Sequence, residues 1–146
     1  MRPSPALLVP ALAALLATAS CTSTTGPAGL KQPPVSSFAP GPCRTGAAAM
    51  LEIGRDVLKL GKGPTPPQDV RDRLTKDQEL LSAMQPDFDA PVRKPVGDLV
   101  VQVGFVRLRS VTNTYAPELA DAVSLAYHRA VAACTVPRPT ASVAVS

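Results

Sequence analysis

The sequence contains few of the residues from which most active sites and nucleic-acid surfaces are built. Among 146 residues it has one histidine, three cysteines, five aromatic side chains and no tryptophan. Surfaces that bind single-stranded nucleic acid combine basic grooves with several aromatic platforms. The net charge of +4 is also spread along the chain rather than clustered. We therefore predict no nucleic-acid partner.

Motifs for catalysis, metals and cofactors are also missing. His128 has no partners at a spacing that builds a nucleophile site, so we interpret it as a partly exposed structural histidine. Cys43 and Cys134 lack the paired spacing of zinc or redox sites. Asp87 and Asp89 are typical of a turn in which Asp89 caps the next helix. The sequence predicts no enzyme, no cofactor and no metal.

The first twenty residues have the layout of an export signal. Arg2 gives a positive start, and residues 6–17 form an apolar run that is too short to span a bilayer. Small residues then lead to Cys21. This arrangement resembles a bacterial lipoprotein signal. The resemblance implies that Cys21 carries acyl chains such as palmitate and anchors the mature protein at the extracytoplasmic face of the cell membrane.

Ordinary secretion is the alternative. Ala17-Thr18-Ala19 also satisfies the small-x-small rule of secretory cleavage, which would release a soluble chain that starts at Ser20. The cysteine count favours lipidation. In an oxidising compartment Cys43 and Cys134 can pair, and acylation then accounts for the third cysteine.

The remaining chain divides by composition. Residues 21–42 are rich in Ser, Thr, Gly and Pro and predict a lipid anchor with a flexible linker. Residues 43–135 are long enough for one small helical domain. Residues 136–146, with two prolines and small residues, predict a disordered tail.

Two of the expected helices come first in this domain. The first, over residues 43–60, has an apolar stripe of Cys43, Ala47, Met50, Gly54 and Val57, widened by Leu51 and Leu58. The second begins at a predicted capping box, Thr65-Pro66-Pro67-Gln68, and ends before Pro86. Its stripe is Val70, Leu74, Leu81 and Met84, interrupted by Asp77.

Residues 96–111 are ambiguous. Val96, Leu99, Val100, Val103 and Val106 have helical spacing, whereas Val101, Val103 and Phe105 alternate as in a strand. We favour a helix because nothing else looks extended and a lone strand would have no partner. Gly97 and Gly104 are seven residues apart, and we expect them to admit a neighbouring helix. The fourth helix, over about 117–135, has Ala120, Val123, Tyr127, Ala130, Val131 and Cys134 on one face.

The two remaining cysteines predict the topology. Cys43 starts the first helix and Cys134 ends the last. With three helices they would lie about 25 Å apart, at opposite ends of the bundle. An even number of helices brings them to the same end. The predicted fold is therefore an all-α, four-helix up-down bundle closed by one disulfide.

One surface group is a candidate for recognition. Arg107 and Arg109, with Tyr115, could bind a carboxylate or a phosphate near one end of the bundle. We expect an envelope lipoprotein that binds an envelope or secreted protein. A carrier or sensor for a small ligand inside the bundle, and a secreted soluble domain, are the alternatives.

Overall fold

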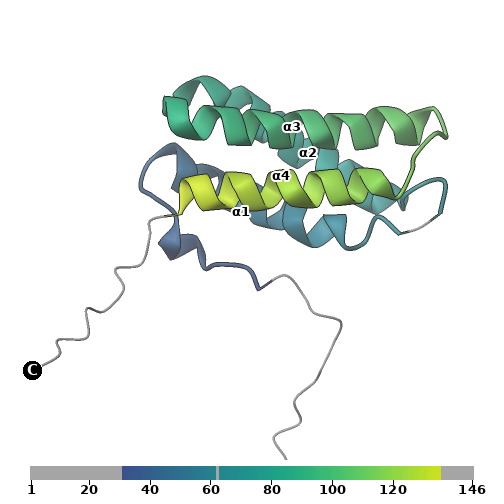
Figure 1. Ribbon diagram of the computed structural model, residues 1–146, viewed down its shortest axis with the longest axis horizontal. Coiled ribbons are helices and arrows are strands. Elements are labelled where there is room, and N and C mark those ends of the chain that lie inside the picture. The colour runs from purple at the N-terminus through teal and green to yellow at the C-terminus, as the bar shows by residue number, and fades with distance from the viewer. Residues whose placement is uncertain (1–30, 62, 136–146) are drawn as a thin grey trace, which may run out of the picture.

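Four helices run alternately up and down in the computed structural model, which describes residues 31–61 and 63–135 (Figure 1). They are α1 (Pro42–Val57), α2 (Gln68–Met84), α3 (Ala90–Val111) and α4 (Glu118–Cys134). Short 3-10 turns, η1 (Val35–Ser37) and η2 (Gln85–Asp87), precede α1 and α3. Each helix packs against the next, and α4 packs back against α1. The predicted all-α fold is confirmed.

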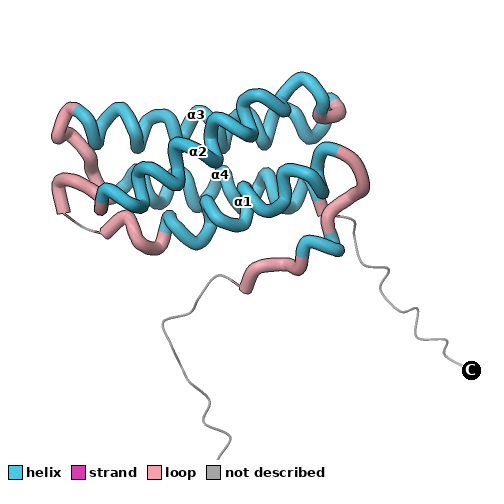
Figure 2. Tube along the Cα trace, turned by 180° about the vertical axis from the view of Figure 1, so that it is seen from behind, coloured by secondary structure: helices cyan, strands magenta, loops and turns pink. Residues whose placement is uncertain are grey.

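Cys43 and Cys134 form the predicted disulfide. Their Cα atoms are 5.3 Å apart, and the bond joins the start of α1 to the end of α4. The termini of the bundle therefore meet at one end, as both views show (Figures 1 and 2). Closing a loop with a sequence separation of 91 contributes about 4–5 kcal/mol in the chain-entropy model.

The segment before α1 closes the same end of the core. Phe38 is fully buried and forms an isolated antiparallel bridge with Thr135. The Ala39 N–H donates to the Cys134 carbonyl at 2.8 Å, beside the disulfide. Residues that the sequence assigned to the linker, 31–42, thus include part of this packed end.

The core consists largely of the predicted stripes. All five predicted positions on α3 are buried. The same holds for most of the predicted stripes on α2 and α4, including Val70, Leu74, Leu81, Val123 and Tyr127. Met84 and Ala120 are partly buried. Leu58 is exposed, at 59%, because it lies just after the end of α1. Gly97 and Gly104 do receive a neighbouring element, because they face the side-chain amides of Gln85 and Gln78.

Two helix starts differ from expectation. The capping box at Thr65 is wrong: α2 begins at Gln68, and the Thr65 hydroxyl instead donates to Asn113 Oδ1 at 3.1 Å, linking two loops. Helix α3 starts six residues before Val96 and runs through Pro95. Pro95 lies past the first turn, so its missing N–H removes one backbone hydrogen bond from the helix. Asp89 does occupy the N-cap position, but its side chain makes no capping bond.

Candidate functional site

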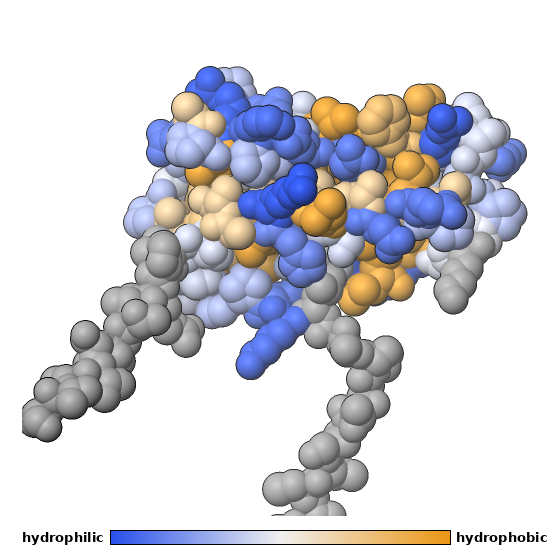
Figure 3. All heavy atoms as spheres, viewed as in Figure 1, coloured by the Kyte–Doolittle hydropathy of each residue, from blue (hydrophilic) through white to orange (hydrophobic). Residues whose placement is uncertain are grey.

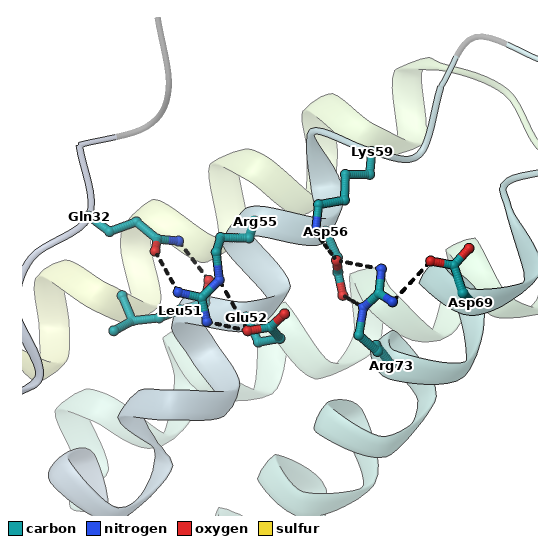
Figure 4. A network of polar contacts seen from close by, with 8 residues as sticks. All are labelled: Gln32, Leu51, Glu52, Arg55, Asp56, Lys59, Asp69 and Arg73. Atoms are coloured by element: carbon teal, nitrogen blue, oxygen red, sulfur yellow. Dashed lines mark hydrogen bonds and ion pairs between the residues drawn. The ribbon is translucent and has the colours of Figure 1, made fainter. Parts of the chain in front are cut away.

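An ion pair between a buried carboxylate and a partly exposed arginine joins α1 to α2 (Figure 4). The Asp56 carboxylate is fully buried and accepts two hydrogen bonds from Arg73, Nε to Oδ2 at 2.9 Å and Nη2 to Oδ1 at 3.0 Å. Lys59 adds a third at 3.1 Å, and Arg73 also reaches Asp69. The carboxylate of Asp56 raises the pKa of Arg73, and Arg73 lowers that of Asp69. The Asp69–Arg73 pair has the four-residue spacing expected within a helix, whereas the contact of Arg73 with Asp56, which joins two helices, was missed from the sequence because Asp56 has no distinguishing neighbour.

Asp77, the polar break in the α2 stripe, is half-buried. Burial is the largest cause that raises its pKa from 3.8 to about 6; the nearby carboxylates of Glu52 and Asp56 act in the same direction, and Lys76 and Arg55 oppose the shift. Its carboxylate makes no hydrogen bond to another of the described residues. Asp77 is therefore a partly desolvated acid at the α1–α2 interface.

The side of α3 that faces solvent carries an apolar row. Its members are at least about half exposed: Val101 (52%), Phe105 (46%), Leu108 (58%) and Val111 (75%). We call these four residues the α3 stripe. Steps of four and three residues place the first three on one side of the helix, opposite the buried side that includes Val103 and Ser110. Figure 3 shows apolar side chains gathered over the C-terminal half of α3.

The α3 stripe is bordered by polar residues and shallow grooves. Towards α2, a groove is lined by Gln78, Gly104, Arg107 and two stripe residues. Towards α4, another contains Asp98 and Leu125, whose side chain is 53% exposed. Single exposed apolar residues are ordinary, but a contiguous row with a polar rim is typical of an interaction surface. The sequence shows this surface only indirectly, in the strand-like alternation of Val101, Val103 and Phe105. That alternation comes from a helix with apolar residues on two sides, which we did not expect.

The three residues of the predicted recognition patch lie in different environments. Arg107 turns toward α2, where Nη1 donates to Gln78 Oε1 at 2.5 Å and Nη2 lies 3.7 Å from Glu79. Arg109 is exposed and lies about 200° further round the helix. Tyr115 is buried in the α3–α4 loop, burial raises its pKa, and its hydroxyl has no partner among the described residues. Joint anion binding by the three stays a prediction.

The polar residues weighed for chemistry lie apart. His128 is exposed and packs edge-on against Tyr127, with ring centroids 5.1 Å apart. Asp87 and Asp89 are both exposed around the turn before α3. Within residues 31–61 and 63–135, no three His, Cys, Asp or Glu side chains gather where they could hold a metal ion.

The predicted lipidation site, Cys21, and the tail 136–146 lie outside the described residues. In the described part of the chain, every helix is too short or too polar to cross a membrane. No protein-family model matches the chain, and no curated protein or solved structure is detectably similar to it.

Proposed function

We propose that this chain is a lipid-anchored cell-envelope protein that binds another protein through the α3 stripe. The observation that carries the proposal is the stripe itself: α3 has one apolar side in the core and a second in solvent. A helix in a small bundle needs only the first for stability. The exposed apolar side is suited to binding a partner protein.

The envelope location rests on the cysteines. Disulfides persist in oxidising compartments outside the cytoplasm, and Cys43 and Cys134 are paired in this fold. That pairing leaves Cys21, at the end of the lipoprotein-like segment, as the third cysteine. An acylated Cys21 would hold the bundle at the extracytoplasmic face of the cell membrane, where envelope and secreted proteins are its available partners.

The shape of the stripe supports a helical or flat partner surface. Phe105 is an aromatic anchor near its centre, and aromatic residues dominate the binding energy of many interfaces. Asp98 and Arg109 provide charged edges on the same helix. The grooves beside the stripe are open rather than deep, which suits a protein surface better than an enclosed small molecule.

Site-specific photocrosslinking in the native host tests this binding role. A photoreactive benzoyl-phenylalanine replaces Phe105 in the full chain. The matched control places it at Leu58, which is more exposed (59% against 46%) but lies after α1. We expect a discrete adduct from position 105 that is lost with Leu108→Ser and is not formed from position 58. An adduct of twice the chain mass would identify the partner as a second copy. Identical adducts from both positions, or none from 105, would refute the proposal.

The anchor is tested by the intact mass of protein extracted from host membranes under non-reducing conditions. A diacylglycerol mass on a chain that starts at Cys21, less two hydrogens for the disulfide, is the expected result. A soluble chain that starts at Ser20 would contradict the lipid anchor and favour a secreted protein instead. A retained small-molecule mass under native conditions would favour the carrier alternative.

A further inference from the structure

Arginines in this bundle use one edge of the guanidinium group repeatedly. The Nε and Nη2 atoms lie side by side and can bind one oxygen together or two oxygens of a carboxylate. Four arginines direct both atoms at chain oxygens: Arg44 at Phe38, Arg55 at Glu52, Arg73 at Asp56 and Arg93 at Phe88. Figure 4 shows this arrangement for Arg55 and Arg73.

Arg71 uses only half of this edge. Its Nη2 donates to Gln68 Oε1, three residues earlier on α2. Its Nε atom is buried and has no hydrogen-bond partner among the described residues. Buried donors are rarely left unpaired in native proteins, and such a donor often marks the place of a water or an ion. The Nε half of this edge therefore lacks an acceptor oxygen within residues 31–61 and 63–135.

The surroundings of Arg71 suit an oxyanion. It lines a groove of about 170 Å³ to which α2 also contributes Gln68, Asp72 and Thr75, and α3 contributes Arg107 and Val111. Two guanidinium groups thus line the groove with one carboxylate. That carboxylate, Asp72, accepts a hydrogen bond from Gln68 Nε2 at 2.8 Å, and the charge of Arg107 is shared with exposed Glu79.

We propose that this groove binds an oxyanion, a carboxylate or a phosphate. Two of its oxygens would accept from Arg71 Nε and Nη2 once the exposed Gln68 amide swings away, and Arg107 would supply the second positive charge. This site differs from the predicted group of Arg107, Arg109 and Tyr115, since neither of the latter two lines the groove. It does not depend on the proposed protein-binding role, although Val111 belongs to both surfaces.

The Nε–Hε signal of Arg71 reports binding directly by NMR. The ¹⁵N-labelled full chain, in a non-ionic detergent, is titrated with sodium phosphate and separately with sodium acetate, with ionic strength held constant by chloride. We expect a saturable shift of this signal with at least one of the two anions, and Arg71→Lys, which removes the Nε donor, identifies it. The anion with the lower dissociation constant in this titration shows whether the groove prefers a phosphate or a carboxylate.

Variants decide whether the site is specific. Arg107→Gln should weaken binding at least threefold, whereas Arg109→Gln, which removes an exposed charge from the same helix, should leave it unchanged. Asp72→Asn should strengthen it. Backbone amide signals outside the groove show that each variant is folded. A linear drift shared by all arginine signals, or equal weakening by the Arg107 and Arg109 variants, would overturn the proposal.

Discussion

Replacing Asp77 with Asn should stabilise the bundle at neutral pH and have little effect in acid. The folded-state pKa of Asp77 is about 6 against an ordinary value of 3.8, because its carboxylate is partly buried near Glu52 and Asp56. The folded protein therefore binds more protons than the unfolded chain between about pH 4 and 6. Stability due to this group is fully present below pH 4 and falls as the pH rises through 6.

The size of the effect follows from the shift. A shift of about two units corresponds to at most about 3 kcal/mol. Because the side chain is only half-buried, screening by solvent reduces this to about 1–2 kcal/mol. Asparagine has nearly the same shape and no charge, so Asp77→Asn should recover this amount above pH 7.

Urea unfolding followed by circular dichroism at 222 nm, at pH 3.5, 5 and 7 with the disulfide intact, measures the difference. Asp72→Asn, on the exposed side of α2, controls for the loss of one negative charge. If the Asp77 variant differs from the natural chain by the same amount at pH 3.5 and pH 7, burial of the charge is not the cause. If Asp72→Asn gives the same pH-dependent gain, net charge explains the effect.

Two further substitutions test the packing between helices. Arg73→Met leaves the buried Asp56 carboxylate without its bidentate partner and should lower the free energy of unfolding in urea by about 3 kcal/mol. Adding Asp56→Leu should recover part of this loss. A loss below about 1 kcal/mol would show that the ion pair does not stabilise the contact between α1 and α2. In Gly54→Ala the new methyl group would lie 2.6 Å from the ring of Tyr127. We expect the free energy of unfolding to fall by about 1–2 kcal/mol in thermal unfolding, since overpacking outweighs the better helix propensity of alanine. An unchanged or higher melting temperature would show that the Tyr127 ring moves aside at no cost.

The fold could be predicted because its determinants are local or covalent. Apolar spacing identified three of the four helices, and the lack of a partner strand favoured a helix for residues 96–111. The positions of Cys43 and Cys134 required an even number of helices. The helix starts were harder because loop contacts compete with capping. The Thr65 hydroxyl donates to Asn113, 48 residues away, and no local sequence pattern predicts that partner.

The polar contacts were beyond sequence reasoning for the same reason. Asp56 and Arg73 meet only because α1 and α2 are antiparallel neighbours in a particular rotation. The sequence pairs Arg73 equally well with Asp69, one turn away on the same helix, and the structure contains both contacts. Arg71 differs from Arg73 by two positions, yet its Nε has no acceptor in the part of the chain that the structure describes. Helix rotation, set by the summed packing of all four helices, decides such differences.

The ambiguity of residues 96–111 has a physical cause that also bears on function. A helix with one apolar side shows a clear period of 3.6, but α3 has apolar residues on two opposite sides, and two sides sampled along one chain resemble the alternation of a strand. The buried side, with Val96, Leu99 and Val103, accounts for the stability of the helix. The α3 stripe is left over after the core is complete. Folding of the bundle does not require this second apolar side, and the protein contact that we propose for Phe105 and its neighbours would account for it.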